Sequence, residues 1–159
     1  MRLVIADTGP INYLILIEQI GLLPLLFARV AIPTAVQLEL RNPAAPAVVK
    51  SWISSPPTWL EVFEDQKVDA SIQALHNGEA AAIMLAEALQ ADLLLIDDRQ
   101  GCRVALQRGL QVTGTLGLLD FAAERGLIDF STAIEKLETT SFRRPLSILQ
   151  ALRLKHKSQ

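Results

Sequence analysis

The sequence is poor in the residues that build disulfide frameworks and thiolate or imidazole metal sites. Cys102 is the only cysteine, and His76 and His156 are the only histidines among 159 residues. One thiol excludes an internal disulfide and a cysteine-rich zinc site, and two histidines are too few for a histidine-based cluster. Metal chemistry in this chain would therefore rely on oxygen ligands.

Long uninterrupted apolar runs are also missing. The longest apolar region, residues 13–33, contains charged residues and Pro24, so it is not expected to span a membrane. The N-terminus lacks the pattern of a signal peptide, because Asp7 and Pro10 interrupt its apolar segment. The sequence therefore predicts a cytoplasmic protein with no membrane partner.

Hydrophobic residues are abundant, at 50% of the chain with a mean hydropathy of +0.30. A sheet covered by helices on both faces would bury this much apolar surface. Alternatively, part of it is buried against a partner or a second copy of the chain. The length of 159 residues predicts a single domain.

The net charge of −2 is unevenly distributed. No acidic residue follows Glu138, and the five basic residues after it leave a charge of −7 on residues 1–142. A polyanion would be repelled by the body and attracted by this tail. The alternative is a solvated end of a C-terminal helix, where cations suit the helix dipole. The tail's basic residues are Arg143, Arg144, Arg153, Lys155 and Lys157.

Short apolar runs alternate with helical patterns along the whole chain. This alternation predicts an α/β fold with a mainly parallel central sheet sandwiched by helices. Asn77 and Ser131 are the expected N-caps of two helices. The expected strands are 2–7, 29–33, 59–63, 91–98 and 110–114, and the expected helices are 10–20, 22–27, 34–41, 46–55, 67–75, 78–90, 99–109, 116–127, 129–140 and 145–155.

Acidic residues stand at the ends of two expected strands. Asp7 ends the first, and Asp97 and Asp98 end the run "LLLIDD". Ligands of parallel sheets bind outside the carboxyl ends of the strands. If the two strands are neighbours, these carboxylates meet at one edge of the sheet. Their mutual repulsion then raises the pKa of at least one of them or requires a bound cation.

Two glutamates lie on expected helix faces that turn toward the core. Glu39 shares its face with Ala35 and Val36, and Glu79 lies in a first turn, in phase with Ile83. Each acid also has an ordinary explanation, such as helix capping or an exposed helix edge. Together, carboxylates without histidine or thiolate favour Mg²⁺ or Mn²⁺.

Other catalytic motifs are missing: there is no G-x-S-x-G elbow, no Walker A loop and no G-x-G-x-x-G after the first strand. Metal-assisted hydrolysis of phosphodiesters needs none of them. Thr8, next to Asp7, would position a water or a phosphate oxygen, or else serve as a local cap. Arg99 and Arg103 share a helix face and would hold phosphates or pair with neighbouring acids.

Four segments resemble the PIN-domain ribonucleases, and most closely their VapC-like toxin branch. The resemblance covers roughly residues 1–125 of a single PIN-like domain spanning 1–159, with 126–159 as a helical C-terminal extension that carries the basic tail. It implies the sandwiched parallel sheet that the alternation also predicts. The segments are "VIADTGPINYLILIEQIGLL", "VAIPTAVQLEL", "GEAAAIMLAEALQADLLLIDDRQGCRVA" and "LQVTGTLGLL".

The resemblance also implies a metal site. Its carboxylate quartet, which binds Mg²⁺ or Mn²⁺, falls on Asp7, Glu39, Glu79 and Asp98, with Asp97 as an alternate for Asp98. Many relatives have aspartate where this chain has Glu79, and the extra methylene would shift the metal geometry.

The function implied by the resemblance is a metal-dependent endoribonuclease that cuts RNA with metal-activated water. It would be the toxin of a toxin–antitoxin pair, a homodimer inhibited by a small antitoxin protein. The alternative is a non-catalytic PIN-like module that binds RNA or protein. A phosphoacceptor domain is disfavoured, because it needs paired acids after the first strand and Asp7 stands alone there.

Overall fold

A computed structural model describes residues 2–67, 72 and 75–157. Its sheet has five strands in the order β3-β2-β1-β4-β5, and every neighbouring pair is parallel. The parallel sheet predicted from the sequence is therefore confirmed. The strands are β1 (Leu3–Ala6), β2 (Arg29–Pro33), β3 (Leu60–Phe63), β4 (Leu93–Leu95) and β5 (Val112–Thr113).

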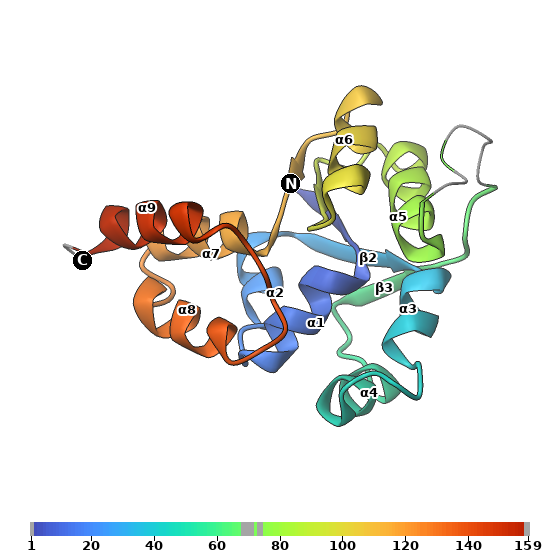
Figure 1. The fold of residues 1–159 in the computed structure, drawn as a ribbon. Helices are drawn as coiled ribbons and strands as arrows, with labels where there is room; N and C mark the ends of the chain where they lie inside the picture. The colour runs from blue at the N-terminus through green and yellow to red at the C-terminus, as the bar shows by residue number, and fades with distance from the viewer. Residues whose placement is uncertain (1, 68–71, 73–74, 158–159) are drawn as a thin grey trace.

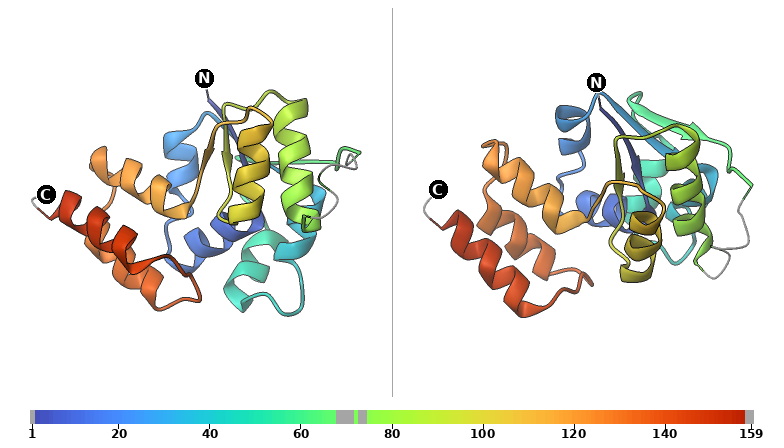
Figure 2. Two further views of the ribbon diagram at one scale, coloured as in Figure 1. Left: turned by 45° about the horizontal axis from the view of Figure 1, so that its top comes forward. Right: turned by 90° about the horizontal axis from the view of Figure 1, so that it is seen from above.

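Helices cover both faces of the sheet, as the alternating pattern predicts. Figure 1 shows α5 and α6 on one side of the sheet and α1 and α4 on the other. In both views of Figure 2, α7, α8 and α9 are gathered beside the sheet. The helices are α1 (Thr8–Leu16), α2 (Leu22–Leu26), α3 (Thr34–Leu40), α4 (Ala47–Ser54), α5 (Asn77–Ala88), α6 (Arg99–Gln107), α7 (Thr115–Glu124), α8 (Phe130–Glu138) and α9 (Leu146–His156).

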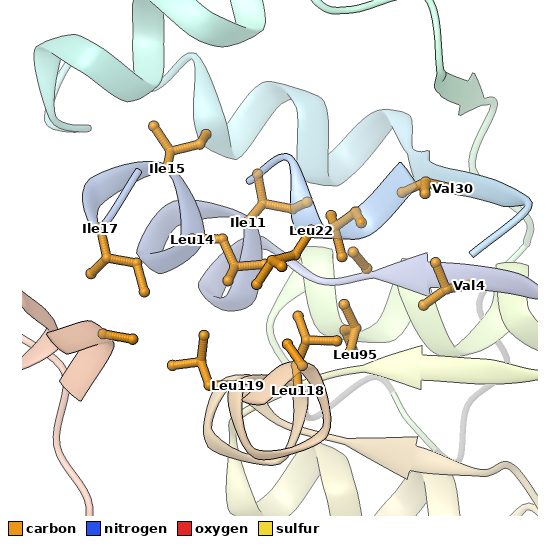
Figure 3. Packing of buried hydrophobic residues seen from close by; sticks show 14 of the residues in the cluster. Val4, Ile11, Leu14, Ile15, Ile17, Leu22, Val30, Leu95, Leu118 and Leu119 are labelled. Atoms are coloured by element: carbon orange, nitrogen blue, oxygen red, sulfur yellow. The ribbon is translucent and has the colours of Figure 1, made fainter. Parts of the chain in front are cut away.

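The strands alternate their side chains between two hydrophobic clusters. Val4 and Leu95 contribute to the cluster under α1 and α7, where Leu14 and Leu119 are fully buried (Figure 3). Ile5 contributes to the opposite cluster, under α5 and α6. Burial on both faces explains why the strands are short continuous apolar runs. No helix in the described part of the chain is long and apolar enough to cross a membrane.

The sheet changes winding direction between β1 and β4. From β1 the strand order runs to β2 and β3 on one side and to β4 and β5 on the other. Ala6 pairs with Leu95, and the backbone N–H of Asp7 donates to the Leu95 carbonyl at 2.9 Å. The carboxyl ends of β1 and β4 therefore coincide at a topological switch point, the place where such sheets bind ligands.

The C-terminal helix is held on α7 and α8 by charged contacts. His156 is buried, stacks on Phe130 with ring centroids 4.5 Å apart, and lies 2.6 Å from Asp120 Oδ1. Lys155 pairs with Asp120 and Glu124 of α7. Arg153 likewise pairs with Glu138 of α8. These two residues of the tail, and also Arg144 through Asp97, are thus engaged by acids of the same molecule.

Several local predictions are wrong in detail. The helix expected at 10–20 ends at Leu16, and the chain turns with a positive φ of 62° at Glu18. The N-cap of α8 is Asp129, which accepts from the Thr132 backbone N–H, and not Ser131. Asn77 is already helical, with His76 at the cap position and no capping bond from its side chain. The helix expected at 67–75 lies largely outside the described residues.

Candidate metal centre

Asp7 is buried where β1 passes into α1. Its exposure is 6%, and its Oδ1 atom has no hydrogen-bond partner within the described residues. It stands at the N-cap position of α1, yet its side chain makes no capping bond there. Helix capping therefore does not explain this carboxylate, and an unpaired buried carboxylate is energetically costly.

Glu79 is buried in the same way at the start of α5. Its exposure is 7%, and its Oε2 atom has no hydrogen-bond partner in the described part of the chain. Its other oxygen lies 4.0 Å from Nε2 of the exposed His76. Two buried carboxylates therefore each have one oxygen without a partner.

Burial and neighbouring acids shift the pKa values of both groups upward. The pKa of Asp7 rises from 3.8 to about 7, chiefly through desolvation and further through the charges of Glu39, Asp97 and Asp98. The pKa of Glu79 rises from 4.5 to about 8, again chiefly through desolvation, with contributions from Asp98 and Asp7. Both carboxyl groups are therefore ionised less easily than usual, and a cation beside them would favour their ionised forms.

Glu39 connects three helices at this edge. Its Oε1 accepts from the Thr8 hydroxyl at 2.6 Å, and its Oε2 accepts from the Gly78 backbone N–H at 2.8 Å. Thr8 begins α1 and Gly78 lies in the first turn of α5, so the carboxylate of α3 is fixed between them. In this structure Thr8 orients an acidic side chain and does not cap its own helix.

The two aspartates after β4 have different partners. Asp97 accepts from the Thr115 backbone N–H at 2.8 Å and hydroxyl at 2.7 Å, and from Arg144 Nη2 at 3.2 Å. Asp98 caps α6 by accepting from the Gly101 N–H at 2.9 Å. That bond lowers the pKa of Asp98, and a hydrogen bond with Glu79 lowers it further. Asp97 is therefore paired with a cation, whereas Asp98 lies beside another acid, Glu79.

All five predicted acids lie at the carboxyl edge around Asp7, and glycines lie against several of them. A Cβ on Gly9 would lie 3.6 Å from Asp97 Oδ2, and one on Gly101 would lie 2.9 Å from Glu79 Oε2. Within the described residues, however, no three Asp, Glu, His or Cys side chains form a ready-made ligand set for one ion. The donor set consists of oxygen atoms, and its unpartnered buried oxygens suit a hard divalent cation.

Gly78 offers a test of how tightly Glu39 is held. A Cβ at this position would meet both carboxylate oxygens of Glu39, lying 2.5 Å from Oε1. We expect Gly78→Ala to displace Glu39 and to lower the unfolding free energy by about 1–3 kcal/mol in a urea titration. Gly21→Ala is the matched control, because a Cβ there meets nothing within 4 Å and the backbone is already αR. Equal stability of the two variants would show that Glu39 moves freely.

Arg144 is a residue of this edge that the sequence did not single out. It lies just before α9, and its Nη2 donates to the Asp97 carbonyl at 2.8 Å as well as to its carboxylate. The predicted phosphate ligands Arg99 and Arg103 line the same surface groove as Arg144. The only available signal for Arg144 was its place in the basic tail, and periodicity does not show which member of a tail reaches a distant strand.

The fold and this edge define an α/β domain whose switch point carries a cluster of carboxylates. A family model described as a PIN domain, DUF3368, matches residues 3–158, and the chain belongs to this PIN-domain family. The predicted family is therefore confirmed. PIN domains are commonly nucleases that use divalent metals, and they are associated with RNA.

A solved structure shares the fold. It is a PilT N-terminus domain protein from the hyperthermophilic archaeon Sulfolobus solfataricus P2, with a TM-score of 0.53 and 16% sequence identity. The match covers 73% of this chain and 89% of the archaeal one. The curated proteins contain no significant match to this sequence.

Proposed function

We propose that this protein is an endoribonuclease that depends on Mg²⁺ or Mn²⁺ and hydrolyses RNA phosphodiesters. The observation that carries the proposal is the pair of buried, unpartnered carboxylate oxygens, Asp7 Oδ1 and Glu79 Oε2, at the switch point of the sheet. A cation in this place would offset the cost of burying both charges. PIN-domain membership supplies the class of reaction.

The proposed metal ligands are Asp7, Glu39, Glu79 and Asp98. A bound divalent ion would lower the pKa of a coordinated water and stabilise charge on the phosphate in the transition state. Asp7 is central to the set, because the charges of Glu39 and Asp98 raise its pKa and its own charge raises that of Glu79. Thr8 keeps the Glu39 carboxylate in place through its 2.6 Å hydrogen bond.

We assign the fourth ligand to Asp98 and not to Asp97. Both oxygens of Asp97 accept hydrogen bonds from Thr115, and Arg144 already compensates its charge. Asp98 instead lies beside a second acid, Glu79, whose pKa it raises. A divalent ion at Asp98 would offset the repulsion between these two acids, whereas at Asp97 it would have to compete with the guanidinium of Arg144.

Metal titration of two aspartate variants tests this assignment. We expect Asp98→Asn to weaken Mn²⁺ binding at least about tenfold in calorimetry, because one charged ligand is lost. Asp97→Asn should bind Mn²⁺ with nearly unchanged affinity but melt at a lower temperature, since its contacts with Thr115 and Arg144 are weakened. The reverse pattern would move the assignment to Asp97.

The nuclease proposal is tested with purified protein and single-stranded RNA. Cleavage should require Mg²⁺ or Mn²⁺ and stop when EDTA is added. The alternative of a non-catalytic PIN-like module predicts that intact RNA is recovered in both conditions. If the protein takes up no Mn²⁺ at millimolar concentration, the metal site and the nuclease proposal both fail.

The cellular role that we propose is that of a VapC-like toxin. The charge of −7 on residues 1–142 suits a small basic antitoxin. Next to the carboxylates, a hollow of about 370 Å³ is lined by Glu39 and by Leu38, which is 59% exposed. An apolar side chain of an antitoxin would fit there. The proposed assembly is a cytoplasmic homodimer, to be tested by sedimentation, and the proposed antitoxin is to be sought by co-expressing any small reading frame that adjoins the gene.

A further inference from the structure

A surface groove of about 420 Å³ starts at the carboxylate edge and runs between α6 and the beginning of α9. Asp97 lines one part of it, which makes the groove continuous with the candidate metal centre. Arg99 and Arg103 line it from α6, and Arg144 lines it from the segment before α9. Three arginines and one acid, Asp97, thus line a groove in a chain whose net charge is −2.

The two arginines of α6 are free to bind a ligand. Both are exposed, and no hydrogen bond or ion pair holds either guanidinium among residues 2–67, 72 and 75–157. By contrast, Arg153 and Lys155 of the basic tail are paired with Glu138, Asp120 and Glu124. A polyanion is therefore attracted less to Arg153 and Lys155 than the sequence suggests, and more to the arginines of the groove.

Arg144 is placed in the groove by rigid contacts. Its guanidinium bonds to the Asp97 carbonyl and lies 5.1 Å from the ring centroid of Phe142, which is buried. Leu106 and Ile148 line the groove with the arginines and are 58% and 45% exposed. Guanidinium planes and apolar side chains offer stacking surfaces to unpaired bases, while the arginine charges attract phosphates.

From these observations we propose that this groove binds the phosphate backbone of a single-stranded nucleic acid and leads it to the carboxylates. Arg99 and Arg103 contact phosphates directly, and Arg144, which is paired with Asp97, lies at the junction with the metal centre. The proposal rests on the proposed function, which requires a strand to reach that centre. The groove is continuous with the carboxylates, which favours a nucleic acid as its occupant. An acidic protein segment could bind the arginines without any need for the groove to reach the carboxylates.

The test measures RNA binding without cleavage. All variants carry Asp7→Asn, are kept in EDTA, and are titrated into a fluorescent single-stranded RNA of about 12 nucleotides while anisotropy is recorded. The double variant Arg99→Ala/Arg103→Ala should bind at least about tenfold more weakly than the parent. Its plot of log K against log salt should flatten by about 1.4, because each lost phosphate contact removes about 0.7 from the slope.

Two further variants control for charge and folding. Arg125→Ala removes one exposed arginine that lies over Phe121, beyond the C-terminal end of α7, and should change neither affinity nor slope. Arg144→Gln should flatten the slope by less than about 0.7, because Arg144 shares its charge with Asp97. Its melting temperature is measured in parallel, because Arg144 also bonds to Asp97. If Arg144 contacts phosphate, its substitution changes the salt dependence of binding. If its role is only structural, the substitution changes the melting temperature alone.

The groove proposal is overturned if the double variant keeps the parent's affinity and slope. It is also overturned if the parent binds no RNA, which would leave a protein ligand as the groove's occupant. Failure of the nuclease proposal gives a different result: the parent then binds RNA through the arginines, yet the protein with intact Asp7 cuts no RNA in Mg²⁺. Conversely, if the protein cuts RNA normally and the arginine variants bind RNA as tightly as the parent, only the groove proposal fails.

Discussion

Replacing Asp7 by asparagine is expected to abolish metal-dependent cleavage of RNA and, at the same time, to stabilise the metal-free protein. Cleavage should fall about 1,000-fold, because losing the central ligand removes several kcal/mol of transition-state stabilisation. The pKa of Asp7 rises from 3.8 to about 7, so its ionised form is strongly disfavoured in the folded state. A neutral amide of the same shape avoids this cost, which is on the order of 4 kcal/mol at pH 8.

These two opposite effects are measured on the same protein preparation. Cleavage of a labelled RNA in Mg²⁺ gives the loss of activity, and urea unfolding in EDTA at pH 8 gives the gain in stability. Glu135→Gln is the matched control: it also removes one negative charge, but from an exposed position on α8. It should change neither quantity appreciably. An Asp7→Asn protein that cuts RNA as fast as the wild type would remove Asp7 from the mechanism.

The metal-free protein should also lose stability as the pH rises from about 4 to about 8. Asp7 and Glu79 have folded-state pKa values raised to about 7 and about 8. In this interval the unfolded chain has released protons that the folded chain still binds, so unfolding becomes easier with rising pH. The stabilisation from these two groups is complete below about pH 4 and lost once both have ionised.

Urea unfolding at several pH values in EDTA measures this dependence. The predicted slope approaches 1.4 kcal/mol per pH unit for each group that is protonated only in the folded state. Saturating Mn²⁺ should reverse the trend, because the metal binds the ionised carboxylates and competes with their protons. A stability that stays level between pH 5 and pH 8 without metal, or that rises, would contradict the burial of two unpaired carboxylates.

The alternation of apolar runs and helical patterns was sufficient to predict the fold class. Runs such as "LLLI" before Asp97 are typical of strands buried on both faces, and the all-parallel sheet confirms this reading. Predicted element ends were less accurate, as Glu18 and Asp129 show. Helix ends depend on single backbone conformations and competing caps, such as the Asp129–Thr132 bond, which periodicity does not encode.

The sequence named the acids of the proposed site, but it did not show how they are organised. The sequence pointed to Asp7, Glu39, Glu79 and Asp98, and the structure places all four at one edge of the sheet. The sequence did not show that Thr8 holds Glu39 or that Arg144 pairs with Asp97. The latter contact joins residues 47 positions apart, and only packing of the C-terminal helices brings them together.

Local patterns in this chain were enough to predict an α/β sandwich with acids at its strand ends, because strand burial and capping chemistry depend on neighbouring residues. Three-dimensional packing was needed to establish that β1 adjoins β4, that Asp7 and Glu79 are buried without full hydrogen bonding, and that Arg144 reaches Asp97. The reason is physical: desolvation and charge–charge interactions depend on distances through space, and spacing along the sequence does not specify them.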